Sequence, residues 1–183
     1  MRLMPTALLG VYEAQSAPVR DHRGQFTRLF CAGELLEAHN GRPVVQINYS
    51  LTRAVGAIRG LHFQRPPIAD AKWVRCLKGR VWDVVVDLRQ SSCTFLRWHA
   101  VELDAIRMNA LFIPEGCAHG FQVLLPHSEL LYLHTAPYAP ECEGGLRWDD
   151  PRLSIAWPKP VTDISDRDRN HPLFGSSFEG IAT

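Results

Sequence analysis

The 183-residue sequence lacks an excess of charge of either sign. Twenty Lys and Arg residues stand against nineteen Asp and Glu residues, which leaves a formal net charge of +1. Nucleic acids and anionic membranes are bound by extended fields of positive charge, so this balance predicts neither as a partner. Any anionic ligand must therefore be bound by a local cluster of basic side chains.

The chain also lacks the cysteine patterns of a disulfide framework or a zinc knuckle, because its five cysteines are odd in number and include no C-x-x-C pair. No segment reaches the roughly 18 to 20 uncharged apolar residues of a membrane-spanning helix. Pro5 and Glu13 interrupt the apolar start of the chain, which argues against a signal peptide. We therefore expect a soluble protein of the reducing cytoplasm.

Repeats, heptads and low-complexity tracts are absent as well, and glycines and prolines separate short apolar runs. A spacing of about ten residues between such runs is typical of a β-sandwich or barrel rather than of βαβ units. The expected strands are 44–49, 73–77, 81–88, 96–103, 109–113, 120–124 and 130–135. Only 32–39 is predicted as an internal helix. The run 81–88 is expected to be buried on both faces except at Asp83 and Asp87, and the tail after Trp157 is either disordered or folded back.

The densest polar motif is Arg-Gly-Leu-His-Phe-Gln at 59–64, followed by Lys72. Alternation in a strand places His62 and Gln64 on one face and Arg59, Leu61 and Phe63 on the other. If the first face lines a barrel interior, it forms a site, and the alternative is a solvated surface strand.

A second histidine, His119, follows a turn and precedes another apolar strand, so a metal site has to be considered. A metal-binding barrel usually offers two histidines two residues apart, and Gln64 stands where the second one is needed. The sequence therefore predicts no metal. It favours acid–base chemistry on an anionic, carbonyl-bearing substrate. Tyr132, which alternates with leucines, points either into the barrel or to solvent, and Tyr138 lies in a proline-flanked loop.

Four motifs occur together and in order: RGLHFQ at 59–64, KWVRCLKGRVWDVVVDLR at 72–89, IPEGCAHGF at 113–121 and LRWDDP at 146–151. Over about residues 21–168 the chain thereby resembles the dTDP-4-dehydrorhamnose 3,5-epimerase family. The resemblance implies one all-β domain over 1–183, a cupin-type jelly-roll barrel with short peripheral helices. It also implies a homodimer that exchanges strands within 1–30, a segment 158–183 packed back on the barrel, and no metal or cofactor.

The activity implied by the resemblance is epimerisation at C3 and C5 of a nucleotide-linked 4-keto-6-deoxy sugar. The expected reaction converts dTDP-4-dehydro-6-deoxy-D-glucose to dTDP-4-dehydro-L-rhamnose through an enolate, for polysaccharide synthesis. By motif match, His62 is the base, Lys72 stabilises the enolate oxygen and Tyr132 returns a proton from the opposite face. Asp168 orients His62, and Asp166 is the alternative if the register differs by two.

The resemblance also implies a set of substrate-binding residues. Arg23 and Arg59 match positions at the diphosphate, and Tyr138 matches one that stacks on the base. The full set is Arg23, Phe26, Arg28, Gln46, Asn48, Arg59, His119 and Tyr138. Arg28 departs from the family, which usually has an acid there near the thymine, and a guanidinium only donates hydrogen bonds. The same chemistry on a GDP- or CDP-linked hexose or heptose therefore remains an alternative. Inversion at C3 or C5 only and a non-catalytic sugar-nucleotide-binding cupin are further alternatives.

Overall fold

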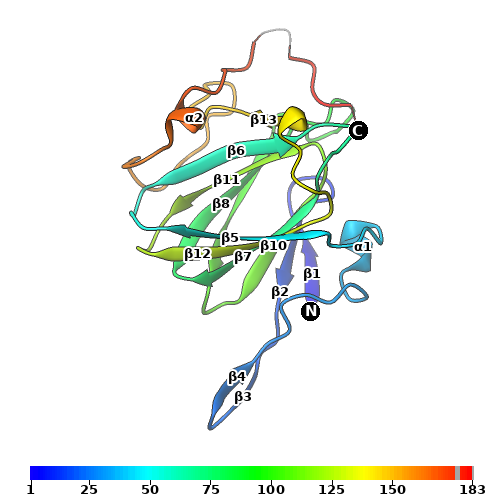
Figure 1. Cartoon of the computed structure of the whole chain (residues 1–183), viewed down its shortest axis with the longest axis vertical. Coiled ribbons are helices and arrows are strands. Elements are labelled where there is room, and N and C mark those ends of the chain that lie inside the picture. Colours follow the sequence, from blue (N-terminus) through cyan, green and yellow to red (C-terminus); the bar gives the residue numbers. More distant parts are fainter. Residues whose placement is uncertain (176–177, 183) are drawn as a thin grey trace.

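Two antiparallel β-sheets stacked face to face form the body of the protein in a computed structural model that describes residues 1–175 and 178–182 (Figure 1). The six-stranded sheet has the order β1 (Arg2–Pro5), β2 (Tyr12–Gln15), β10 (Asn109–Ile113), β7 (Lys72–Lys78), β12 (Ser128–His134), β5 (Gln46–Thr52). The five-stranded sheet has the order β13 (Glu143–Gly145), β6 (Ile58–Gln64), β11 (Cys117–Val123), β8 (Arg80–Asp87), β9 (Trp98–Asp104). The predicted all-β jelly-roll architecture is confirmed.

Each of the seven apolar runs predicted as strands overlaps a strand, with ends that differ by a few residues. The seven runs do not include the four short strands within residues 2–26 or β13, because strands of three or four residues are too short to show alternation. Strands within 1–30 were expected from the resemblance alone. The helix α1 (Leu36–His39) is shorter than the predicted 32–39, since the residues before it form turns and Asn40 ends it in the left-handed conformation, with φ of 52°. A second short helix, α2 (Asp166–Arg169), was not predicted.

The space between the sheets changes from apolar to polar along the strands. On β12, Leu130 lies in the buried core, whereas Tyr132 and His134 line a cavity. On β7, Val74 belongs to the core and Lys72 to the cavity. Because every second residue of a strand faces the same side, each strand carries its inward side chains from core to cavity in steps of two residues. The core thus supports the floor of the site.

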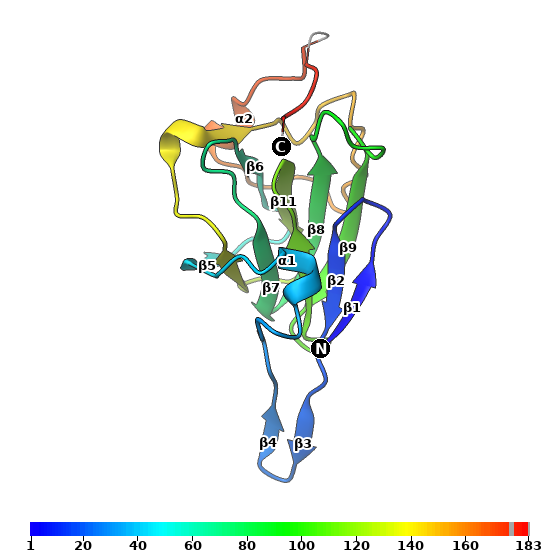
Figure 2. The same cartoon turned by 90° about the vertical axis from the view of Figure 1, so that its right-hand side faces the viewer.

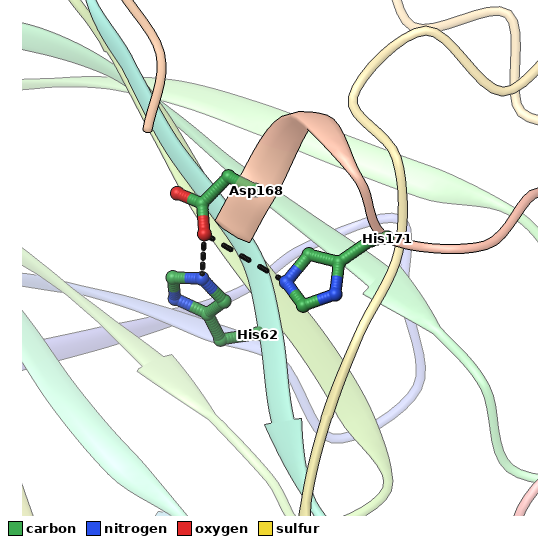
Figure 3. Close-up of side chains that lie close together, drawn as sticks. All are labelled: His62, Asp168 and His171. Atoms are coloured by element: carbon green, nitrogen blue, oxygen red, sulfur yellow. Dashed lines mark hydrogen bonds and ion pairs between the residues drawn. The ribbon is translucent and has the colours of Figure 1, made fainter. Parts of the chain in front are cut away.

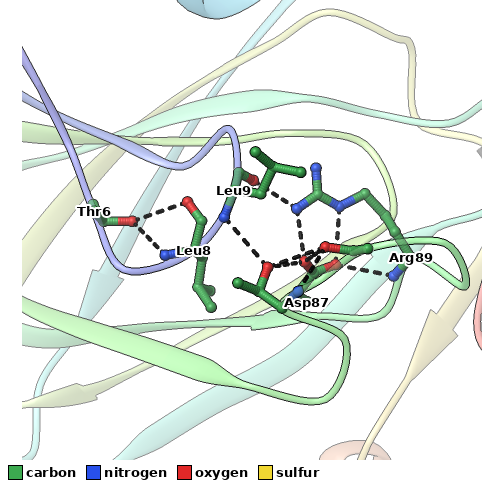
Figure 4. Close-up of polar contacts among 7 residues, drawn as sticks. Thr6, Leu8, Leu9, Asp87 and Arg89 are labelled. Carbon is green, nitrogen blue, oxygen red and sulfur yellow. Dashed lines mark hydrogen bonds and ion pairs between the residues drawn. The ribbon is translucent and has the colours of Figure 1, made fainter.

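The two aspartates of β8 correct one prediction, because Asp83 and Asp87 are each 0 % exposed rather than facing solvent. Asp87 accepts hydrogen bonds from Arg89 Nη2 at 2.7 Å and from Thr94 Oγ1 at 2.6 Å (Figure 4). Arg89 Nη2 also donates to the carbonyl of Leu9 at 2.6 Å. Asp87 is buried at low cost because its oxygens are satisfied, and the network fastens the N-terminal loop to the barrel.

The chain after β13 runs along the outer face of the five-stranded sheet. Phe174 and Ile181 are buried in a cluster with Val84 and Val86 of β8, whose side chains point away from the core between the sheets. The amide of Gln122, fully buried, donates to the carbonyl of Lys159 at 2.9 Å. Residues 176, 177 and 183 of the expected C-terminal segment lie outside the described residues.

A two-stranded hairpin, β3 (Val19–Asp21) and β4 (Gly24–Phe26), projects from the body in both views (Figures 1 and 2). Phe26, which pairs with Val19 at the end of the hairpin nearer the body, is 76 % exposed. The base of this arm is held by the buried Arg75, whose Nη2 donates to the carbonyl of Leu29 at 3.0 Å. None of the described helices is long and apolar enough to cross a membrane.

Candidate active site

A cavity of about 680 Å³ opens at the polar end of the space between the two sheets. Its size falls in the range of about 300 to 1,000 Å³ that is usual for small-molecule sites. Of the residues predicted from the sequence, the structure brings these into its wall: Gln46, Asn48, Arg59, His62, Lys72, His119, Tyr132, Tyr138 and Asp168. All four predicted catalytic side chains thus share one cavity.

An irregularity in β6 places Arg59 and His62 in the same cavity and overturns the prediction that they face opposite sides. His62 pairs with His119 and Arg59 with Phe121, so three steps on β6 match two on β11. The extra residue on β6 shifts the alternation of its side chains by one position, so that Arg59 and His62 face the same side of the strand. The irregularity occurs at Gly60, which has φ of +124° and comes so close to β11 that a Cβ there would lie 2.6 Å from the Cα of Gly120.

His62 forms a short hydrogen bond with Asp168, at 2.7 Å between Nε2 and Oδ1 (Figure 3). The second oxygen of Asp168 accepts the backbone N–H of Gly60 at 3.1 Å. Burial raises the pKa of the Asp168 carboxyl, but the hydrogen bond and charge of His62 and the N–H of Gly60 outweigh it and lower the pKa to about 2. Asp168, rather than Asp166, is therefore the ionised partner of His62, and it leaves Nδ1 as the basic nitrogen.

The helix α2 fixes the position of Asp168. Ser165 precedes it, and its hydroxyl accepts the backbone N–H of Asp168 at 3.1 Å, the usual arrangement of a helix N-cap. The same turn brings in Arg167, whose Nη2 lies 3.1 Å from His62 Nε2 and which pairs with Glu143. Sequence reasoning missed Arg167 and Glu143, since nothing in their spacing ties them to His62.

His171, also missed, lies with its Nε2 3.7 Å from Asp168 Oδ1 (Figure 3). The ligand atoms of His62, Asp168 and His171 lie within 4.8 Å of one another and are of the types that bind transition metals. The guanidinium of Arg167 stands beside the first two of them. A cation would meet this positive charge, so the donor set fits a metal poorly, and the expectation of a metal-free site stays a prediction.

A second imidazole–carboxylate pair lies deeper, between β11 and β8. His119 Nε2 is 2.9 and 3.0 Å from the two oxygens of Asp83, and both side chains are buried. Burial lowers the pKa of His119 in spite of the opposing charge of Asp83. The polar Asp83 within an apolar strand was the signal in the sequence for this pair, although its partner was not predicted.

Lys72 and Tyr132 reach the cavity from the six-stranded sheet, opposite the sheet that carries His62. Burial lowers the pKa of the Lys72 ammonium, and the charge of Asp70 opposes this shift most. Within the part of the chain that the structure describes, the ammonium has no hydrogen bond or ion pair. The Tyr132 hydroxyl contacts Ser50 Oγ at 3.2 Å, and burial raises the pKa of Tyr132. A cation and a neutral proton donor thus face the imidazole.

Polar side chains continue towards the mouth of the cavity. Arg59 Nε donates to Thr52 Oγ1 at 2.9 Å, which fixes its guanidinium at one side. The hydroxyl of Tyr138 donates to Glu143 at 2.9 Å, while the residue as a whole is 56 % exposed. This end of the cavity therefore offers a cation for an anionic group and an accessible aromatic surface.

Three predicted binding residues lie outside this cavity, on the arm or just after it. Arg23 is paired with Asp21 at 2.6 Å, and Arg28 forms an ion pair with Glu34. The expectation for Arg23 and its strand is a role in the site of a partner subunit, so the roles of Arg23, Phe26 and Arg28 stay predictions.

The family model for dTDP-4-dehydrorhamnose 3,5-epimerase matches residues 5–176. The dTDP-4-dehydrorhamnose 3,5-epimerase of Salmonella typhimurium is 39 % identical, over 97 % of this chain and 98 % of its own. The dTDP-4-dehydrorhamnose 3-epimerase of Streptomyces niveus is 37 % identical, over 97 % and 86 %. The crystal structure of an epimerase from Legionella pneumophila in complex with dTDP-4-keto-L-rhamnose superimposes with a TM-score of 0.89 at 33 % identity, over 94 % and 92 %. The chain therefore belongs to the dTDP-4-dehydrorhamnose 3,5-epimerase family.

Proposed function

We propose that the protein converts dTDP-4-dehydro-6-deoxy-D-glucose to dTDP-4-dehydro-L-rhamnose by inverting C3 and C5. The observation that carries this proposal is the arrangement of His62, Tyr132 and Lys72 in one cavity, with the base and the phenol on opposite sheets. The Salmonella relative and the ligand of the Legionella structure support the choice of substrate. Epimerisation changes no oxidation state, so the reaction needs no redox cofactor.

His62 takes the proton from the carbon beside the C4 carbonyl. Asp168 holds the Nε2–H and stabilises the imidazolium that forms, so that Nδ1 accepts the proton. The electron pair of the broken C–H bond moves onto the C4 oxygen and gives an enolate. Lys72 donates a hydrogen bond to this oxygen, where a buried ammonium stabilises developing negative charge strongly.

Tyr132 returns a proton to the same carbon from the opposite face and thereby inverts it. Burial raises the pKa of its phenol, so the hydroxyl keeps its proton until the enolate has formed. The phenolate then regains a proton and His62 releases one, which restores both groups. A base and an acid on one side of the sugar would return the original epimer.

The number of inverted carbons is the main alternative within this chemistry. The Streptomyces niveus relative is named a 3-epimerase and is 37 % identical, so inversion at C3 alone is the second candidate. Both candidates use the same enolate. They differ in whether the sugar presents its C5 proton to His62 after C3 has been inverted.

The nucleotide and the assembly belong to the same proposal. We take dTDP as the carrier, with CDP and GDP sugars as the alternatives that Arg28 raises. The active form is a cytoplasmic homodimer in which the arm reaches the partner's cavity. The exposed Phe26 on the arm and the exposed apolar side chains of Ile47 and Tyr49 on β5 support such an association.

Deuterium incorporation tests the proposal. The protein is incubated in D2O with dTDP-4-dehydro-6-deoxy-D-glucose, and the product is analysed by mass spectrometry and NMR. Two deuterons are expected in a product of inverted configuration at C3 and C5, and one deuteron at C3 would identify a 3-epimerase. The His62→Ala variant is expected to incorporate none. Absence of deuterium from the wild-type product with dTDP, CDP and GDP sugars would refute the proposed activity.

A further inference from the structure

A third imidazole–carboxylate pair, Asp70 and His134, lines the cavity and has no part in the proton transfers proposed above. His134 Nδ1 lies 2.6 Å from Asp70 Oδ2, and their side chains are 14 % and 8 % exposed. The other oxygen of Asp70 accepts the backbone N–H groups of Thr135 at 3.2 Å and Ala136 at 3.3 Å. Three donors therefore hold the carboxylate in place behind the imidazole.

The pair fixes which nitrogen of His134 carries the proton. With Nδ1–H donating to Asp70, the neutral imidazole presents Nε2 as a hydrogen-bond acceptor. Asn48 agrees with this assignment: its oxygen accepts from Gln46 Nε2 at 3.3 Å, and its Nδ2 faces His134 Nε2 at 3.4 Å. That last contact is long, so a hydroxyl at an ordinary distance of about 2.8 Å displaces it.

The position of His134 identifies the part of the ligand that it meets. In the β-ladders His134 lies opposite Lys72 on β7 and opposite Gln46 on β5, and its ring is stacked on Tyr132 with centroids 6.1 Å apart. Lys72 is the group that holds the C4 oxygen in the proposed reaction. Of the two carbons beside C4, only C3 carries a hydroxyl, because C5 carries the methyl group and the ring oxygen.

We propose that the Asp70–His134 pair determines specificity for the sugar, with His134 Nε2 accepting a hydrogen bond from the hydroxyl on C3. This assignment rests on the proposed sugar-nucleotide substrate. A sugar that lacks this hydroxyl leaves Nε2 with only the long contact to Asn48, and a poorly satisfied acceptor in the cavity is costly, so the site should disfavour such sugars. The carboxylate is required because the other tautomer would present an N–H in place of the acceptor.

Equilibrium binding tests the assignment without turnover. The ligands are dTDP-6-deoxy-glucose and its 3-deoxy analogue, neither of which can form an enolate, and calorimetry gives their dissociation constants. Wild-type protein is expected to bind the hydroxylated sugar about tenfold more tightly. His134→Phe keeps the aromatic ring but removes the acceptor, so the ratio should fall to about one. His134→Gln offers an acceptor near the position of Nε2 and should restore part of the preference.

The controls separate recognition from folding and from catalysis. All variants should bind dTDP alone as wild type does, since the free nucleotide has no sugar hydroxyl, and the 2-deoxy analogue should show the same ratio in wild type and His134→Phe. A preference for the 3-hydroxyl that survives in His134→Phe, or a wild type without one, would overturn the assignment. Failure of the deuterium experiment would instead refute the proposed epimerase activity. The ratios of dissociation constants would still decide whether His134 recognises the hydroxyl on C3.

Discussion

At the scale of single residues, the cavity uses the pairing of imidazole with carboxylate three times, in different surroundings. His62 is the partly exposed member, with 27 % of its side chain accessible, whereas His119 is buried. Burial lowers the pKa of His119, so it stays neutral at physiological pH and acts as a hydrogen-bonding group. Access to solvent is what suits His62, rather than His119, to exchange protons with water.

Replacing Asp168 by Asn should change both activity and the pH dependence of stability. The carboxyl has a pKa of about 2 in place of its usual 3.8, so its ionised form stabilises the fold above about pH 4, and this contribution is lost as pH falls towards 2. The shift corresponds to about 2 kcal/mol. Urea unfolding should therefore show wild type more stable than Asp168→Asn at pH 6, with the gap closing near pH 2. An equal gap at both pH values would contradict a stabilising role of the ionised Asp168 carboxylate. The exchange activity of Asp168→Asn should also fall about 100-fold.

Replacing Lys72 should separate turnover from binding. Lys72→Met removes the charge at the C4 oxygen, so kcat should fall about 100- to 1,000-fold with little change in KM. Burial lowers the pKa of the ammonium below the usual 10.5, so wild-type activity should decline at a lower pH than a free lysine would dictate. Lys72→Arg keeps the charge and should move this alkaline limit upwards. A limit common to both proteins would assign it to another group.

Replacing Tyr132 by Phe should uncouple exchange from inversion. His62 remains able to remove and return a proton, so deuterium still enters the substrate, but no acid delivers a proton from the other face. NMR of the recovered sugar should show deuterium with retained configuration. Inversion at the wild-type rate would show that another group is the acid.

At the scale of the element, the irregular strand β6 decides which side chains share the cavity. Alternation along one strand correctly predicted that His62 and Gln64 share a face, but it wrongly placed Arg59 on the opposite face. The register against β11 contains the missing information, and it depends on residues about sixty positions away. Regular strands such as β12 could be predicted because their alternation is uninterrupted. Short-range patterns therefore located the strands but could not show where one of them departs from regularity.

Gly60→Ala should disrupt this strand. The added Cβ would lie 2.6 Å from the Cα of Gly120 and 2.8 Å from the carbonyl oxygen of His119, at a φ that L-residues avoid. We expect the free energy of unfolding to fall by about 3 kcal/mol, measured by urea denaturation. Gly33→Ala is the matched control, because a Cβ there has nothing within 4 Å and its φ is ordinary. A similar loss in both variants would contradict the importance of the close approach.

At the scale of the whole molecule, the arm is the feature that one chain by itself does not explain. It projects away from the body and carries predicted binding residues that are remote from this chain's own cavity (Figures 1 and 2). The motifs of the sequence predicted the fold and most of the cavity, because those residues lie on regular strands. They could not supply Arg167, His171 or the Asp70–His134 pair, whose proximity arises only when separate segments fold together.

Mixing two inactive variants tests whether the arm serves the partner subunit. In a heterodimer of Arg23→Ala and His62→Ala chains, the cavity with an intact His62 receives an intact Arg23 from its neighbour. Unfolding and refolding the two variants together should therefore restore up to about a quarter of wild-type activity, because half of the dimers are mixed and each has one complete site. If Arg23 acts within its own chain, the mixture stays as inactive as its parents.

The hydrogen bond between His62 and Asp168 also implies an order of steps in the folding of each newly synthesised chain. The two residues are 106 positions apart, and Asp168 belongs to the short helix α2, which lies outside the sandwich and close to the C-terminus. The ribosome releases the strands of the barrel before this segment, and contacts between distant residues form slowly. During refolding, the fluorescence change that accompanies burial of Trp73 in the barrel should precede the return of activity, because the barrel forms before Asp168 reaches His62.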